Sequence, residues 1–140
     1  MKKGHDRVTF KAYNMNQPSL LPASLDELVP KEHLVRVVNQ TIEELSIEPL
    51  LKRYKGGGTS SFHPKMMLKV MVYAYTQKTF TSRKIAKALR ENIQFMWISG
   101  GNKPDFRTIN RSRGSVMKEV VGEVFTSVIE YLLEKKYVRL

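Results

Sequence analysis

Cationic side chains gather in one stretch of the 140-residue chain. Between residues 80 and 114 lie eight Lys and Arg but only two acidic residues, so +6 of the net charge of +11 falls in a quarter of the length. Such a cluster suits the phosphates of a nucleic acid, because cations that neutralise phosphates release condensed counterions. The simpler alternative is a solvated basic face, although charge that serves only solubility would be spread more evenly.

Two segments of this stretch have the residue types of a pair of DNA-reading helices. Ser82–Leu89 combines small Ala with branched apolar residues, which let a second helix cross closely. Residues 105–111 are typical of a recognition helix anchored by Phe106 and Ile109. In a major groove, Arg donates to guanine O6 and N7, and Asn bonds to adenine N6 and N7. The side chains that we expect to read bases are Arg107, Thr108, Asn110, Arg111 and Arg113, and those that we expect to hold phosphates are Arg83, Lys84, Lys87 and Arg90.

Two alternatives remain open for this region. Residues 92–103 separate the two expected helices, so the tight turn of a standard helix-turn-helix is absent and an ordinary basic helical bundle is the competing interpretation. A basic helix also suits RNA as well as duplex DNA. The aromatics within Phe95–Ile98 could stack on unpaired bases, but their dense apolar neighbours favour core packing.

No other group of residues predicts catalysis, a metal site or a cofactor. The chain has no Cys, and His5, His33 and His63 lack metal-ligand spacing. The segment Gly56–Ser60 lacks the Gly-Lys-Ser/Thr ending of a phosphate-binding loop. Neither a Ser/His/Asp set nor the paired acids of a two-metal site can be identified. We therefore expect no enzyme activity, no metal and no cofactor.

The elements that position these residues are predicted to be helices throughout. The first helix is expected over residues 30–45, with Pro30 at its first position. Further helices are expected over 48–54, 64–77, 82–91, 92–98 and 115–136, and another begins at 105. Only Tyr137–Leu140 shows a trace of β alternation. The fold class is thus all-α, a compact multi-helix bundle containing a helix-turn-helix-like unit, with a long C-terminal amphipathic helix. Residues 1–29 form an arm, which Phe10, Tyr13, Leu20 and Leu21 would pack onto a helical DNA-binding domain at 30–140.

The apolar stripe of the expected C-terminal helix has two interpretations. Its pairs recur every four residues, so the stripe drifts around the helix and does not keep a strict heptad. Packing on the domain is the simpler one. The alternative is pairing with a helix of another chain, which would make the protein a dimerisation or assembly module.

Nothing in the sequence predicts a membrane protein. No stretch approaches 18 apolar residues, and no apolar segment follows the opening Met-Lys-Lys as a signal peptide requires. We expect a cytoplasmic protein with an anionic partner.

Taken together, five motifs resemble the N-terminal domain of InsH-like bacterial insertion-sequence transposases. In chain order, they are Asn16–Pro22, Leu28–Leu34, His63–Val70 with Tyr73–Tyr75, Ser82–Ala86 and Pro104–Arg111. Each motif is weak alone, but their order and spacing are specific and cover residues 13–138. One departure is Ser112, where the pattern has an aromatic residue.

The resemblance implies binding of double-stranded DNA at the terminal inverted repeats of the element, on the bacterial nucleoid. It also implies that the DDE acidic triad, with its two divalent metals, belongs to a separate domain absent from this chain, which would then bind DNA without cutting it. The alternative role is a homodimer or a truncated inhibitor that pairs with a full-length transposase.

Overall fold

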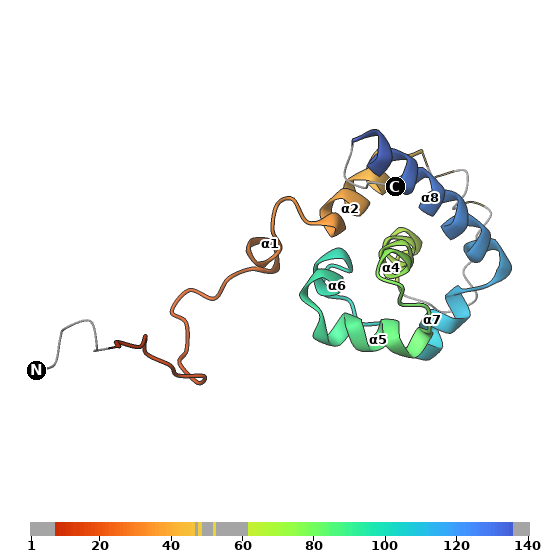
Figure 1. Cartoon of the computed structure of the whole chain (residues 1–140). Coiled ribbons are helices and arrows are strands. Elements are labelled where there is room, and N and C mark those ends of the chain that lie inside the picture. Colours follow the sequence, from red (N-terminus) through yellow and green to blue (C-terminus); the bar gives the residue numbers. More distant parts are fainter. Residues whose placement is uncertain (1–7, 47, 49–51, 53–61, 136–140) are drawn as a thin grey trace, which may run out of the picture.

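The computed structural model describes residues 8–46, 48, 52 and 62–135, except for the side chains of residues 115 and 116. This part of the chain contains helices and no strand, which confirms the all-α prediction (Figure 1). The helices are α1 (Leu25–Leu28), α2 (Leu34–Glu44), α4 (Pro64–Thr76), α5 (Ser82–Glu91), α6 (Ile93–Ile98), α7 (Phe106–Ser112) and α8 (Ser115–Glu134). None of them is long and apolar enough to cross a membrane.

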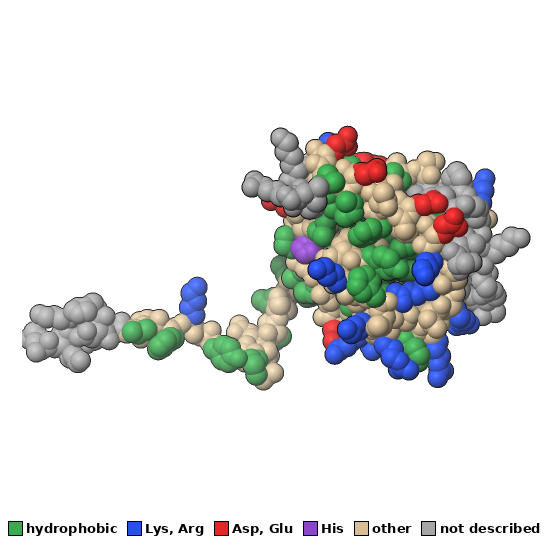
Figure 2. Space-filling model, turned by 45° about the vertical axis from the view of Figure 1, so that its right-hand side comes forward, with side chains coloured by type: hydrophobic (Ala, Val, Ile, Leu, Met, Phe, Trp, Pro, Cys, Tyr) green, Lys and Arg blue, Asp and Glu red, His purple; other side chains and the backbone are tan. Residues whose placement is uncertain are grey.

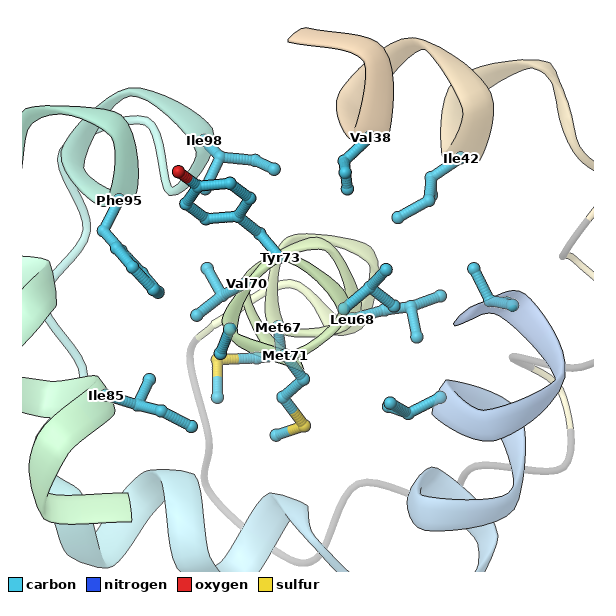
Figure 3. Packing of buried hydrophobic residues seen from close by; sticks show 14 of the residues in the cluster. Val38, Ile42, Met67, Leu68, Val70, Met71, Tyr73, Ile85, Phe95 and Ile98 are labelled. Atoms are coloured by element: carbon cyan, nitrogen blue, oxygen red, sulfur yellow. The ribbon is translucent and has the colours of Figure 1, made fainter. Parts of the chain in front are cut away.

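Helix α4 is the centre of the domain. Its sequence is apolar almost all round, which is typical of a buried helix. Figure 1 shows it end-on with the other helices around it, and Figure 3 shows their side chains converging on it, among them Val38 from α2, Ile85 from α5 and Phe95 from α6. Pro64 occupies the first turn as predicted, where its missing N–H costs no hydrogen bond.

The apolar stripe of α8 packs on its own domain. Its buried members face α4 and α2 and are Met117, Val120, Val121, Val124, Val128 and Leu132. Phe125 and Ile129 are partly buried against the same core. Pairing with another chain would therefore have to use a surface other than this stripe.

The start of α2 differs from the prediction. The helix begins at Leu34 rather than Pro30, and its N-cap is His33, whose Nδ1 accepts a hydrogen bond from the Val35 N–H at 3.0 Å. The Arg36 guanidinium binds the backbone carbonyls of Val29 and Pro30, at 2.8 and 3.1 Å. These contacts keep the preceding residues in a turn, so Pro30 lies outside the helix.

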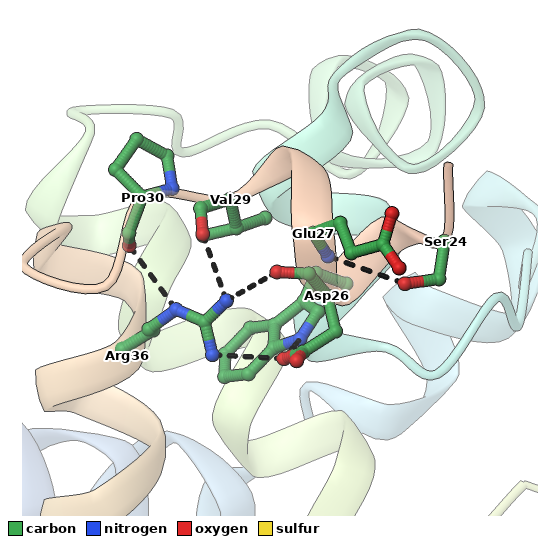
Figure 4. Close-up of polar contacts among 7 residues, drawn as sticks. Ser24, Asp26, Glu27, Val29, Pro30 and Arg36 are labelled. Carbon is green, nitrogen blue, oxygen red and sulfur yellow. Dashed lines mark hydrogen bonds and ion pairs between the residues drawn. The ribbon is translucent and has the colours of Figure 1, made fainter. Parts of the chain in front are cut away.

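Arg36 joins three helices at one point (Figure 4). It forms an ion pair of 2.8 Å with Asp26 in α1, and its guanidinium lies 4.8 Å from the ring centroid of Trp97 in α6. The indole N–H of Trp97 donates to the same Asp26 carboxylate at 3.2 Å. Helix α1, which the sequence analysis assigned to an irregular arm, is thereby tied to α2 and α6.

The segment before α1 does not pack on the domain, contrary to expectation. It runs away from the bundle in Figure 1, and the side chains of Phe10, Tyr13, Leu20 and Leu21 are 84%, 85%, 99% and 88% exposed. Its hydrogen bonds within the described residues are local, such as Asn16 N–H to Asn14 Oδ1 at 3.0 Å. Because Pro18 and Pro22 have no N–H and favour extended backbone, the segment has little means of folding back by itself.

Three expectations concern residues outside the described part of the chain. They are most of the helix expected at 48–54, the glycine-containing loop at 56–61 and the β alternation at 137–140.

Candidate nucleic-acid interface

Helix α5 presents a basic face to solvent. Its N-cap is Thr81, whose Oγ1 accepts a hydrogen bond from the Lys84 N–H at 3.1 Å. Ile85, Ala86 and Leu89 are buried, which turns the opposite side outward. The exposed side chains on that side are Arg83, Lys84, Lys87, Arg90 and Glu91.

Helix α7 presents a second set of polar side chains. Its N-cap is Asp105, whose Oδ1 accepts from the Thr108 N–H at 2.8 Å. That hydrogen bond, helped by the charges of Arg107 and Arg111, holds the pKa of Asp105 below its usual range. Because Ile109 is buried, the side chains of Arg107, Asn110 and Arg111 are exposed.

The two helices contact each other through Phe106. The Arg83 guanidinium lies 3.9 Å from the centroid of the Phe106 ring, and the Arg107 guanidinium lies 5.6 Å from it. A cation over an aromatic face is attracted by the ring quadrupole. One ring thus holds a guanidinium from α5 beside one from α7. From the sequence, only an anchoring role was expected for Phe106, and its contact with the two guanidinium groups was missed.

Ser82 links the same two helices by hydrogen bonds. Its hydroxyl donates to Asn110 Oδ1 at 3.4 Å and accepts from Arg113 Nη1 at 3.3 Å. Arg113 is partly buried, and Thr108 is partly buried with its backbone committed to the cap and to Ser112. Of the predicted base-reading residues, Arg107 and Arg111 are therefore the best placed to meet a partner.

The insertion between the two helices is a structural element of the bundle. Residues 93–98 form α6, which contacts α4 and α5, and Phe95 and Ile98 are buried as predicted. Gly100 and Gly101 then turn the chain with positive φ values of 62° and 81°, which favour glycine. Helices α5 and α7 are in contact across this insertion, and a helix-turn-helix unit remains a prediction.

The cations of α5 and α7 form no ion pair within the described part of the chain. Among the residues that the structure describes, none of the nine predicted contact residues forms an ion pair, whereas Lys65 and Lys69 share Glu43 and Arg36 binds Asp26. In Figure 2, blue side chains gather along the lower edge of the domain, at the height where Figure 1 places α5 and α7. Most red side chains lie higher. The lower edge is thus the more electropositive side in this view.

An open groove of about 380 Å³ runs beside the basic face of α5. Its lining consists of Thr79, Lys84, Lys87, Ala88, Glu91 and Asn92. The two ammonium groups, the hydroxyl and the amide can donate to an anionic oxygen, but the Glu91 carboxylate beside them offsets part of their charge. The positions of Thr79 and Asn92 carry no sequence signal, since they depend on how the loops at the two ends of α5 fold. Within the described ranges, no group of three His, Asp or Glu side chains could hold a metal ion.

The fold and this surface can be compared with known proteins. A family model described as "Transposase domain (DUF772)" matches residues 23–115. The match begins just before α1 and ends at the first residue of α8, so it includes both basic helices. No curated protein and no solved structure matches the chain.

Proposed function

Because the chain belongs to the transposase domain (DUF772) family, which has a role in transposition, we propose that it binds duplex DNA through α5 and α7. The binding site on the DNA consists of the terminal inverted repeats of an insertion sequence, as in InsH-like transposases. The chain supplies end recognition, the cutting is done by a separate catalytic domain, and binding takes place on the bacterial nucleoid.

One observation carries the proposal. The cations on α5 and α7 are exposed, lack an acidic partner within the described residues and sit on two helices in contact. By contrast, Lys65 and Lys69 pair with Glu43, and Arg36 pairs with Asp26. An unpaired set on one side instead supplies the potential that attracts a polyanion.

The two helices have different tasks in this proposal. Lys84, Lys87 and Arg90 on α5 hold phosphates, which set register and carry no sequence information. Arg107 and Arg111 on α7 contact base edges. Arg83, held on the Phe106 ring, lies where the two sets meet.

Fluorescence anisotropy with the purified chain tests the proposal. The probes are duplexes of the terminal repeats that flank the parent gene and a scrambled duplex of equal composition, at about 150 mM salt. We expect a preference of about a hundredfold or more for the repeats, since specific binding commonly exceeds non-specific binding by at least this margin. With about five phosphates engaged, the log–log salt slope should lie near −4.5, a loss of roughly 500-fold between 50 and 200 mM.

Two results would contradict the proposal in different ways. Equal binding to both duplexes would leave only a basic surface, with specificity supplied elsewhere. Stronger competition by RNA of matched length than by duplex DNA would assign the surface to RNA, whose A-form grooves present a different geometry. A variant that replaces Lys65 and Lys69, which already pair with Glu43, is the matched control and should bind like the wild type.

A further inference from the structure

We propose that two copies of this chain associate by exchanging their N-terminal segments, residues 8–23. The aromatic part of this segment, Phe10 to Met15, occupies a cavity between α4 and α8 of the other copy. This association is independent of DNA, and the apolar stripe of α8 contributes only Val121 to the surface that it uses.

The segment has the composition of an interface, and its large apolar side chains are exposed. Phe10, Tyr13 and Met15 are 84%, 85% and 79% exposed. Monomeric proteins rarely expose several large apolar side chains so close together. No charged residue occurs from Ala12 to Leu25. Interface cores are likewise depleted of charge and enriched in aromatic residues and Met.

The cavity has the complementary composition. It measures about 280 Å³, and its apolar lining consists of Met71, Tyr75, Phe80 and Val121. Phe80 is 56% exposed at the rim and lies edge-on to Tyr75, with ring centroids 5.6 Å apart. Grooves lined by aromatics are the usual receptors of extended, proline-containing segments.

The rim of the cavity adds hydrogen-bond donors. Arg113 and Lys118 lie there. An extended segment with few internal hydrogen bonds presents free backbone carbonyls, which accept from such cations. Lys11 is the one charged residue between Phe10 and Met15, so its side chain has to point away from these two cations, and the segment is uncharged from Ala12 to Leu25.

The position of the segment favours a second copy over its own domain. Its root, α1, is tied to α2 and α6 by Asp26, Arg36 and Trp97. Figure 1 shows the segment leaving on that side, whereas α8, which borders the cavity, lies on the opposite side.

The length of the segment is sufficient for exchange. The 14 residues from Phe10 to Ala23 span at most about 45–50 Å when extended, which exceeds the width of roughly 35 Å of a domain of this size. Two reciprocal contacts related by a twofold axis would also double the buried area, which helps a small contact reach the size of a stable interface.

Cysteine cross-linking tests the exchange, since the chain has no Cys of its own. Asn14→Cys places a thiol beside Tyr13, and Lys118→Cys places one at the rim, both at exposed positions. A tagged Asn14→Cys chain is mixed with untagged Lys118→Cys and oxidised without DNA. The matched control replaces Lys118→Cys by Gln40→Cys, an exposed position on α2.

We expect the Asn14→Cys and Lys118→Cys chains to cross-link at least tenfold faster than the control pair. Adding Phe10→Ser and Tyr13→Ser to the first chain should remove that excess and also remove the concentration-dependent dimer that we expect sedimentation velocity to detect. Equal rates for the two pairs would overturn the proposal. So would closure of an Asn14→Cys/Lys118→Cys double variant on itself as a monomer, because the segment would then occupy its own cavity.

Discussion

Arg83 lies over the face of Phe106, with its guanidinium carbon 3.9 Å from the ring centroid. The contact joins the first turn of α5 to the first residue of α7, two helices separated by α6 in the chain. Arg107 approaches the same ring at 5.6 Å. Phe106 therefore orients two cations from two helices, and the geometry of the basic surface depends on an uncharged side chain.

Replacing Phe106 by Leu should weaken DNA binding without unfolding the domain. Leu retains an apolar side chain against the core but removes the ring that both guanidinium groups face. Exposed cation–π contacts contribute about 0.5–1 kcal/mol each, so we expect the loss of both to lower the affinity by roughly 5- to 30-fold. Anisotropy gives the affinity, and circular dichroism checks the helix content.

The Phe106→Tyr variant is the control, since it keeps an aromatic face and should bind like the wild type. If Phe106→Leu bound DNA as tightly as Phe106→Tyr at equal helix content, stacking would have no part in presenting Arg83 and Arg107.

Substitutions on α5 and α7 should have different signatures. Arg107→Ala or Arg111→Ala should cost about 1–3 kcal/mol on the terminal repeat, a loss of roughly 5- to 150-fold, and relax specificity. Lys84→Ala or Lys87→Ala should weaken binding to the repeat and to scrambled DNA alike and lower the salt slope by about one. Anisotropy titrations over a salt series measure both. A uniform loss for Arg107→Ala would make it a phosphate contact.

Local sequence signals were sufficient to predict most helices and the outward side chains of the basic surface. Pro64, Thr81 and Asp105 mark helix starts through local backbone chemistry, and helical periodicity turns Arg107 and Arg111 outward once Ile109 is buried. These features depend on residues within one or two turns, which the sequence displays directly.

The features that sequence reasoning missed depend on distant residues. Asp26 meets Arg36 and Trp97, which are 10 and 71 positions away. These contacts create α1 and displace the start of α2 from Pro30. Likewise, Arg113 turns toward Ser82, 31 positions earlier, only because α5 and α7 are in contact. No periodicity or capping pattern encodes such pairs.

Acid should release α1 from the bundle. Hydrogen bonds from Arg36 and then from Trp97 hold the pKa of Asp26 below its usual range. Since the folded pKa is lowered, this stabilisation is present above the ordinary carboxyl pKa of about 3.9 and is lost as the pH falls through the folded value. Trp97 is the only tryptophan, so its emission reports on the site. We expect a change in emission below about pH 4 that Asp26→Asn lacks.

Glu27→Gln provides the comparison, because it removes a neighbouring exposed carboxylate of α1. This variant should keep the acid transition of the wild type. An Asp26→Asn chain with the wild-type transition would mean that the emission follows a different group.

Alkali should unfold the domain through Tyr73. This residue is 2% exposed and lies against Phe95, with ring centroids 4.9 Å apart, and burial raises the pKa of its phenol to about 12. Because the folded pKa is raised above the ordinary value near 10, the resulting stability is full below that value and is lost as the pH rises toward 12. Tyr73→Phe removes the ionisable group, so this variant should unfold at a higher pH than the wild type. Circular dichroism between about pH 9 and 12.5 measures the unfolding midpoint.

Tyr75→Phe is the control, because it changes the partly buried tyrosine two residues along α4, and it should unfold at the same pH as the wild type. Coincident midpoints for Tyr73→Phe and the wild type would show that another group drives the alkaline transition.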